Sequence, residues 1–383
     1  MSPTKLTQLA DFGQSLWLDY ISRPLLESGA LKKLIDSGLR GMTSNPTIFN
    51  QAISSTTDYD DQIIRLQEKG KSVFDIYDDL TIRDVQQAAD FFKPVYEKTN
   101  GLDGYVSLEI NPKLAMNVDE SIKEGKRLFQ KTARANVMIK VPSTHAGFPV
   151  IEELLASGIP VNVTLIFSLE QYKETTKAFL KGLNRFWEAG GDLTKIRSVA
   201  SVFVSRIDTA IDKLLDEKIT QAKEAAVKSK LESLKGKAAV ANCKIIFEQF
   251  KIMTASEAFM SLSRNKADVQ RVLWASTGTK NPNYSDLKYV TELISKPTVN
   301  TVPQKTLETF VDHGEVKEGL SGTPNDAQAI VNTLNQFGID LNHICAHLLK
   351  EGVGAFEKSF EELLISIETK AARLSVIPGG VYE

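Results

Sequence analysis

The sequence predicts an α/β protein that folds as a (β/α)8 TIM barrel with additional helices. Short apolar runs rich in β-forming residues recur eight times and alternate with helix-like segments, a pattern typical of parallel βαβ units. Polar residues interrupt these runs near their C-terminal ends, the face where barrels assemble a site from several strands. A doubly wound open sheet would show much the same alternation, but its outermost strands lie too far apart to share one site.

The expected strands are short runs rich in β-forming, apolar residues. They lie at 15–20, 41–46, 104–110, 136–142, 160–167, 198–205, 271–277 and 298–303. The helix-like segments between them include 24–38, 115–132, 147–158 and 168–191. The chain of 383 residues has room for additions to a barrel of roughly 250 residues.

Two tracts lie outside this repeat. Residues from about 208 to 264 are rich in Lys, Glu and Ala and predict two or three consecutive helices with a break around Gly236. In the tract at about 323–375, Thr323 can cap a helix that has Pro324 in its first turn, and one long helix or a broken pair then follows. We therefore expect residues 1–383 to form a single barrel domain with a helical insertion and C-terminal helices.

Composition and charge argue against several classes of protein. The formal net charge of -2 gives no electrostatic reason to expect nucleic acid or an anionic membrane as a partner. The N-terminus has no basic segment followed by a sustained apolar core, and nowhere do about 18 apolar residues run together. Only Cys243 and Cys345 occur, which suits a reducing compartment. We expect a cytoplasmic protein that neither enters a membrane nor binds nucleic acid.

A lysine interrupts one of the apolar runs. Lys140 follows Val137, Met138 and Ile139 in a strand that we expect to be buried on both faces. Burying an ammonium costs several kcal/mol, so this lysine is neutralised, is paired, or lies at the open end of the strand. Desolvation lowers the pKa of a lysine, and a neutral amine can attack a carbonyl carbon to form a Schiff base.

Two carboxylates interrupt other runs. Asp19 lies near the end of the first run and Glu109 lies in the third, each among apolar neighbours. Near a lysine they could divide the work of general acid and base, provided that their environments push their pKa values apart. Alternatively, each caps the following helix or forms a structural ion pair with Lys140. The residues themselves leave these alternatives open.

Amides, hydroxyls and cations at the strand ends suit a polyhydroxylated, phosphorylated ligand. The candidate binding residues without charge are Thr43, Asn45, Asn162, Thr164, Ser201, Phe203 and Ser276. Arg206 and Lys280 follow late strands, where a phosphate also finds backbone N–H groups at a helix start, although such a cation can equally lie on the surface. Asn162 begins an N-x-T sequon, but its place in an apolar strand argues against glycosylation.

Neither a metal nor a nucleotide cofactor is expected. His343 and His347 are four residues apart on an expected helix, but the glutamate of HExxH and a nearby third ligand are missing from the sequence. The glycines of 190–198 and 276–282 match neither GxGxxG nor GxxxxGK[ST], the patterns of nucleotide phosphate loops.

Five blocks of the sequence resemble the transaldolase family, and more closely its longer bacterial branch. These blocks are LWLDYISRPLLESG, GMTSNPTIFNQAI, NVMIKVPSTHAG, VNVTLIFSLEQY and VLWASTGTKNPNYSD, and together they span nearly the whole chain. The resemblance implies a class I aldolase-type barrel that moves a dihydroxyacetone unit between sugar phosphates in the non-oxidative pentose phosphate pathway. The implied donors are sedoheptulose 7-phosphate and fructose 6-phosphate, and the implied acceptors are glyceraldehyde 3-phosphate and erythrose 4-phosphate.

The resemblance also implies roles for individual residues. Lys140 would form the Schiff base and Asp19 would act as acid and base at the C4 hydroxyl of the ketose. Glu109 would work through a water that Thr164 also holds. The matching ligand-orienting positions are Asn45, Asn162 and Ser201, and the matching phosphate-site positions are Arg206 and Ser276.

The phosphate site departs from the family pattern at one position. The shorter transaldolases carry an arginine just after the position of Ser276, where this chain has STGTK. We expect Lys280 to substitute, although a lysine is a point charge and cannot make the bidentate contact of an arginine.

The resemblance implies ping-pong kinetics without a metal or an organic cofactor, with sugar phosphates as the partners. For the oligomeric state, a monomer and a homodimer are both left open. The nearest alternative is a related aldolase that cleaves fructose 6-phosphate and releases free dihydroxyacetone. Two further alternatives are a barrel that binds sugar phosphates without catalysis, and RNA binding through the Lys-rich helices after Asp208. Acidic residues are interleaved in those helices and no aromatic platform accompanies them, which argues against RNA.

Overall fold

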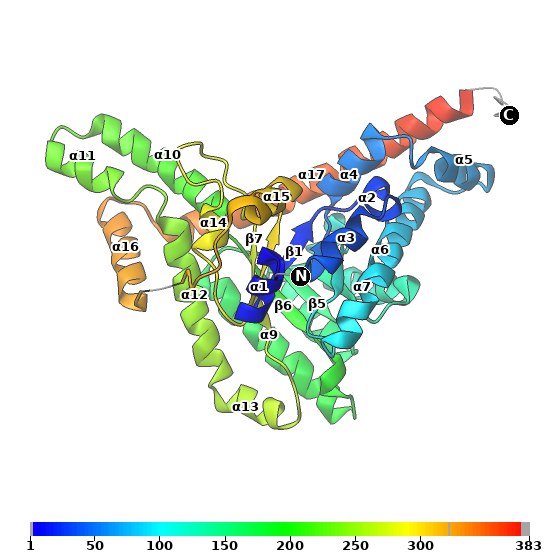
Figure 1. Cartoon of the computed structure of the whole chain (residues 1–383), viewed down its shortest axis with the longest axis horizontal. Coiled ribbons are helices and arrows are strands. Elements are labelled where there is room, and N and C mark those ends of the chain that lie inside the picture. Colours follow the sequence, from blue (N-terminus) through cyan, green and yellow to red (C-terminus); the bar gives the residue numbers. More distant parts are fainter. Residues whose placement is uncertain (1–2, 321, 377–383) are drawn as a thin grey trace.

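A computed structural model describes residues 3–320 and 322–376, and it confirms the closed (β/α)8 barrel (Figure 1). The eight strands run parallel and pair in chain order, and the ring closes because β1 pairs with β8 as well as with β2. The doubly wound alternative is wrong, since an open sheet has two unpaired edges. The strands are β1 (Gln14–Asp19), β2 (Gly41–Thr43), β3 (Tyr105–Glu109), β4 (Val137–Pro142), β5 (Val161–Ile166), β6 (Ser198–Phe203), β7 (Arg271–Ala275) and β8 (Thr298–Val302).

Helices connect the strands and surround the barrel. Up to β6 they are α1 (Lys5–Phe12), α2 (Arg23–Glu27), α3 (Ala30–Asp36), α4 (Pro46–Ser55), α5 (Asp60–Glu68), α6 (Val73–Lys98), η1 (Pro112–Leu114), α7 (Val118–Thr132), α8 (Gly147–Ala156), α9 (Leu169–Glu188) and η2 (Leu193–Lys195). After β6 they are α10 (Ser205–Gln221), α11 (Ala225–Glu232), α12 (Ala238–Thr254), α13 (Glu257–Arg264), α14 (Lys288–Thr291), α15 (Gln304–His313), α16 (Pro324–Gln336) and α17 (Leu341–Val376). Within the described ranges, none of these helices is long and apolar enough to cross a membrane.

Four helices, α10 to α13, separate β6 from β7, where the sequence predicts two or three. The expected break is present, because Gly236 lies between α11 and α12 with a φ of +67°. Two further breaks were not predicted: an extended backbone at Ala222 ends α10, and the side chain of Ser256 caps α13. Composition does not mark the first break, since residues that favour helices continue through it.

Helix α17 is a single helix of 36 residues, so the alternative of a broken pair is wrong. The predicted start of α16 is confirmed, with Thr323 accepting a hydrogen bond from the backbone N–H of Asp326 and Pro324 in the first turn. From its start near α10, α17 crosses the end of the barrel, contacts β5, and continues along α4 and α5 (Figure 1). It therefore covers part of the face at which the parallel strands end.

The opposite end of the barrel holds a buried ion pair. Arg271, at the start of β7, lies 2.8 Å from a carboxylate oxygen of Asp103 and donates a hydrogen bond of 2.9 Å to the hydroxyl of Ser15. Ser15 in turn donates to the other oxygen of Asp103 at 2.8 Å. All three side chains are buried. This network compensates the cost of desolvating the two charges at the end of the barrel where the strands begin.

We expect the substitution Asp103→Ala to lower the free energy of unfolding by about 3–5 kcal/mol, because the guanidinium of Arg271 stays buried without its carboxylate. Urea unfolding followed by circular dichroism measures the change. Asp61→Ala is the control, since that carboxylate is 87% exposed and lies 4.0 Å from Arg65. A loss in Asp103→Ala no larger than the roughly 0.5 kcal/mol allowed for the control would contradict this account.

Candidate active site

A cavity of about 170 Å³ lies at the C-terminal end of the barrel. It is lined by polar and charged residues from several strands, together with residues of the following loops and of α17. The residues singled out in the sequence that line it are Asp19, Thr43, Asn45, Lys140, Asn162, Thr164, Ser201, Phe203, Arg206, Ser276 and Lys280. Glu109 is the exception, and it lines a smaller neighbouring cavity that shares Phe356 with this one.

Strand register explains why three of these side chains meet. Glu109 in β3 is paired with Lys140 in β4, which is paired with Asn162 in β5. Paired residues on parallel neighbours point to the same side of the sheet, here the barrel interior. The distance between Lys140 Nζ and Glu109 Oε2 is 3.7 Å.

Lys140 is buried and forms no close ion pair with any described residue. Its side chain is 7% exposed, and its Nζ donates one hydrogen bond of 3.0 Å, to the backbone carbonyl of Ser44. The ring of Phe356 covers it, with the centroid 5.7 Å from Nζ. Its distance to Glu109 exceeds the 2.7–2.9 Å or so of a charge-assisted hydrogen bond.

A second buried lysine shows the structural alternative in the same chain. Lys370 of α17 lies 2.7 Å from a carboxylate oxygen of Asp60 and also donates to the backbone carbonyls of Ile53 and Thr56 at the end of α4. Its ammonium therefore joins α17 to the end of α4 and the start of α5. Lys140 has much looser polar contacts and faces a cavity, which favours a chemical role over a structural one.

Asp19 and Glu109 do not cap the helices that follow their strands, because Ser22 caps α2 and Asn111 caps η1. Asp19 is half-buried at the end of β1 and accepts a hydrogen bond of 2.6 Å from the hydroxyl of Thr43. Burial raises its pKa above the usual carboxyl value, an effect that Lys140 and Thr43 partly offset.

Burial also raises the pKa of Glu109, and the nearby Lys140 opposes this shift. Among the described residues, neither Oε2 of Glu109 nor the buried hydroxyl of Thr164 has a hydrogen-bond partner. Two carboxyl groups with raised pKa values therefore lie near one amine, and one of them has hydrogen-bonding capacity to spare.

Hydrogen bonds orient several neutral polar residues of the cavity. Ser201 donates a hydrogen bond of 2.6 Å to the side-chain oxygen of Asn162, and the amide nitrogen of Asn162 donates one of 3.0 Å to Ser107. Asn45 caps α4 by accepting a hydrogen bond of 3.0 Å from the N–H of Ile48. These bonds hold the side chains in defined orientations, as ligand recognition requires.

Two cations lie at the rim of the cavity. Arg206 is half-buried in the first turn of α10, and burial lowers its pKa, with Glu351 acting against this shift. The guanidinium lies 5.6 Å from the ring centroid of Phe203. Lys280 is exposed. Neither cation forms an ion pair with any carboxylate of residues 3–320 or 322–376, so both are free to bind an anionic group.

Backbone conformation is unusual at two positions next to the site. Ser276, directly after β7, has a φ of +56°, and Leu165 in β5 has a φ of +60° beside a register shift between β5 and β6. For residues other than glycine such values cost about 1–3 kcal/mol and persist where the surroundings determine them. They turn the chain just after Thr164 and at Ser276, where side chains enter the cavity.

Other residues that line the cavity were not singled out in the sequence. Thr301 and Pro303 stand near the end of the eighth run, and the hydroxyl of Thr301 is a signal of the same kind as the polar residues at the other strand ends. Thr301 lies 2.8 Å from the hydroxyl of Thr43. Phe356 had no local signal, because nothing in an amphipathic helix indicates which distant strand it covers.

Within the described part of the chain, no group of three or more His, Cys, Asp or Glu side chains is placed to hold a metal ion.

A closed (β/α)8 barrel with a buried lysine, two carboxyl groups and two cations that have no ion-pair partner among the described residues has, at its C-terminal face, the features of a barrel enzyme. Residues 16–367 match the family described as Transaldolase/Fructose-6-phosphate aldolase, and the chain belongs to that family.

Bacterial transaldolases are similar over nearly the whole chain. A transaldolase of Trichodesmium erythraeum is 42% identical over 98% of this chain and 100% of its own length. A protein named Transaldolase 2 from Nostoc sp. is 41% identical, with the same coverage of both chains. A transaldolase of Saccharopolyspora erythraea is 44% identical over 95% of this chain and 97% of its own.

Close packing of α17 on the barrel is testable at two glycines. A Cβ at the buried Gly352 would lie 2.9 Å from Cδ2 of Leu165, whereas a Cβ at the exposed Gly354 would meet no atom within 4 Å. We expect Gly352→Val to lower the free energy of unfolding by about 1–3 kcal/mol through overpacking. Gly354→Ala should raise it by up to about 1 kcal/mol, because alanine favours the helix. Equal effects in urea unfolding would contradict the close approach.

Proposed function

We propose that the chain is a transaldolase that transfers a dihydroxyacetone unit from fructose 6-phosphate or sedoheptulose 7-phosphate to an aldose phosphate, through a Schiff base on Lys140. The observation that carries this proposal is the environment of Lys140, a buried amine with one hydrogen bond that faces a cavity beside two carboxyl groups. Full-length similarity to proteins named transaldolase supports the same reaction.

The reaction begins when the neutral amine of Lys140 attacks the C2 carbonyl of the ketose phosphate. Loss of water gives an iminium ion, which can accept an electron pair from the neighbouring carbon. The carboxylate of Asp19 removes the proton of the C4 hydroxyl, the bond between C3 and C4 breaks, and an aldose phosphate leaves. The three-carbon unit stays bound as an enamine.

The second half reverses these steps with a different aldehyde, glyceraldehyde 3-phosphate or erythrose 4-phosphate. The enamine carbon attacks the carbonyl carbon of the acceptor, and Asp19 returns its proton to the new hydroxyl. Hydrolysis of the iminium then releases the product ketose. A general base works best when its pKa is near the operating pH, and burial shifts Asp19 in that direction.

Glu109 and Thr164 would act together on water. Oε2 of Glu109 and the hydroxyl of Thr164 are both buried and have capacity for one more hydrogen bond. A water held between them would carry protons during formation and hydrolysis of the iminium. The burial that raises the pKa of Glu109 suits a group that must both give and take a proton.

The substrate would be held at two places. Asn45, Asn162 and Ser201 would bind its hydroxyl groups, while Arg206 and Lys280 at the rim would bind its phosphate. The hydroxyl of Ser276 and the N-terminal turn of α10 lie at the same rim. The phosphate is farthest from the carbonyl carbon in these sugars, which agrees with cations at the rim and the lysine below.

Transfer instead of cleavage requires that water does not protonate the enamine. Phe356 of α17 lines the cavity and covers Lys140, so α17 would limit the access of water to the bound three-carbon unit.

The proposed substrates place the reaction in the non-oxidative pentose phosphate pathway. The cytoplasm is the proposed location, and the free, buried thiols of Cys243 and Cys345 are consistent with a reducing compartment.

We expect Lys140→Met to abolish transfer and to leave the fold intact, because methionine fills the space of the lysine without its amine. Fructose 6-phosphate followed by borohydride should add mass to the peptide that contains Lys140 in the unsubstituted enzyme and add none in the variant. Circular dichroism and the unfolding midpoint check the fold.

Lys280→Met is the matched control, because it removes a lysine from the rim of the same cavity. It should still give the adduct, at higher concentrations of fructose 6-phosphate. An adduct on another lysine, or substantial transfer by Lys140→Met, would overturn the assignment. Without an acceptor, the enzyme should release little free dihydroxyacetone. Release without an acceptor as fast as turnover with an acceptor would identify a cleaving aldolase instead.

Thr43→Val should shift the acid limb of the pH profile to higher pH. The hydroxyl of Thr43 donates to Asp19 and lowers its pKa, so its loss raises that pKa further. Asp19 must be ionised to take a proton, and activity is therefore lost as the pH falls through its pKa. The measurement is kcat/KM between pH 4 and 8 or so, where a carboxyl group with a raised pKa titrates. Thr301→Val is the comparison variant, because it removes the neighbouring hydroxyl and keeps the hydroxyl of Thr43 that donates to Asp19. An acid limb that stays in place or moves to lower pH in Thr43→Val would refute the role of Asp19.

A further inference from the structure

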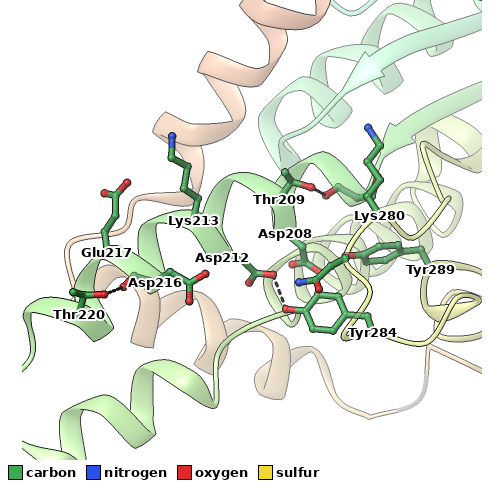
Figure 2. Close-up of a pocket in the computed structure, with 12 residues that line it drawn as sticks. Asp208, Thr209, Asp212, Lys213, Asp216, Glu217, Thr220, Lys280, Tyr284 and Tyr289 are labelled. Carbon is green, nitrogen blue, oxygen red and sulfur yellow. Dashed lines mark hydrogen bonds between the residues drawn. The ribbon is translucent and has the colours of Figure 1, made fainter.

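A second cavity, of about 610 Å³, lies beside the active site along α10. Figure 2 shows its lining, with Asp208 and Asp212 on α10 and with Tyr284 and Tyr289 from the segment that follows β7. Lys280 belongs to both cavities. The active site and this second cavity are thus adjacent, and the loop that carries Lys280 lies between them.

Each of the two aspartates makes the same pair of contacts. Asp208 accepts a hydrogen bond of 2.8 Å from the hydroxyl of Tyr289 and one of 2.7 Å from the backbone N–H of Ala239. Asp212, one helical turn later, accepts one of 2.6 Å from Tyr284 (Figure 2). It also accepts one of 2.9 Å from the backbone N–H of Gly236. Both carboxylates therefore join α10 to the segment after β7 and to the start of α12.

The surroundings of the tyrosines hold them in place. Gly236 approaches Tyr284 so closely that a Cβ there would lie 2.7 Å from the ring carbon Cζ. The ammonium of Lys288 lies 5.6 Å from the ring centroid of Tyr284 and 5.7 Å from that of Tyr289. Asp208 and Tyr289 are also buried, which strengthens their hydrogen bond relative to one in water.

The same helix also holds the beginning of the segment. The backbone N–H of Ser205 donates a hydrogen bond of 3.0 Å to the carbonyl of Ser276, and the two hydroxyls lie 3.1 Å apart. Residues 277–283, which include Lys280, are therefore attached to α10 on both sides, at Ser276 and at Tyr284. Arg206 lies in the first turn of that helix, so one helix fixes the positions of both rim cations.

We propose that Tyr284 and Tyr289, through Asp212 and Asp208, are positioning residues that hold Lys280 opposite Arg206 and thereby set the affinity of the site for a phosphate group. This inference rests on the proposed function, in which these cations bind the phosphate of the sugar. A lysine is a flexible point charge, and the backbone that carries it must be ordered before its charge can help binding. Attachment of the loop at both ends reduces the entropy that is lost when the phosphate binds.

The test removes one hydroxyl group at a time. Tyr284→Phe and the double variant Tyr284→Phe/Tyr289→Phe keep the rings and break the hydrogen bonds to the aspartates. We expect Tyr284→Phe to raise KM for fructose 6-phosphate by roughly three- to tenfold with kcat nearly unchanged, as the loss of one hydrogen bond allows, and the double variant to raise it further. With glyceraldehyde, an acceptor that lacks phosphate, kcat/KM should change by less than about twofold.

Inorganic phosphate provides a readout that does not depend on the reaction. Its dissociation constant, measured by titration of the full chain, should rise by the same factor as KM. Tyr172→Phe is the control, since it removes a buried tyrosine hydroxyl from α9 that has no hydrogen-bond partner among the described residues. We expect no change in either quantity for this control.

Two outcomes would overturn the inference. If Tyr284→Phe lowers the free energy of unfolding but leaves KM and phosphate binding unchanged, the tyrosines only stabilise the helices after β6. If glyceraldehyde and the phosphorylated acceptors are affected equally, the contacts do not act on the phosphate. Borohydride trapping in the same variants distinguishes this failure from that of the proposed function, because the adduct on Lys140 depends on the lysine and not on the loop.

Discussion

Pairing of β1 with β8 is the interaction on which the rest of the structure depends. It closes the parallel sheet, so that the carboxyl ends of all eight strands surround one point. Side chains as distant in sequence as Asp19 and Lys280 then share a cavity of about 170 Å³. Because strand register places Glu109, Lys140 and Asn162 in neighbouring paired positions, the lysine enters the barrel interior between a carboxylate and an amide.

Two lysines of the described structure, Lys140 and Lys370, are buried in different surroundings. Lys370 is held by a close carboxylate and by two backbone carbonyls, and this network compensates the cost of removing its charge from water. Lys140 has one hydrogen bond and a carboxylate at 3.7 Å. A site that leaves an amine so loosely bound gives up stability, and the proposed reaction at that amine would account for the loss. Helix α17 connects the two, since it carries Lys370 at one end and places Phe356 over Lys140.

Additions to the barrel act at its C-terminal face. Helix α10 carries Arg206 in its first turn and holds the loop after β7 at Ser276, Tyr284 and Tyr289. Helix α17 packs against the strained turn at Leu165 through Gly352. Both helices thus connect the scaffold to the site, the first at the rim where an anion would bind and the second above the lysine. In a barrel enzyme the strands position the reacting groups, and the connecting segments determine which substrates reach them.

The barrel and most of the residues that line its cavity follow from the sequence, because strands buried on both faces read as apolar runs and polar residues stand out within them. All eight runs are strands, and Asp19, Lys140 and Thr164 project from three of them into one cavity. The number of helices between β6 and β7 was missed, because helix-forming residues continue through a break. Only the tertiary structure decided that Phe356 covers Lys140, that α17 is continuous, and that Tyr284 and Tyr289 donate hydrogen bonds to aspartates of α10. These contacts join segments far apart in the chain, and the local periodicity of a sequence carries no information about which distant surface a helix or loop will meet.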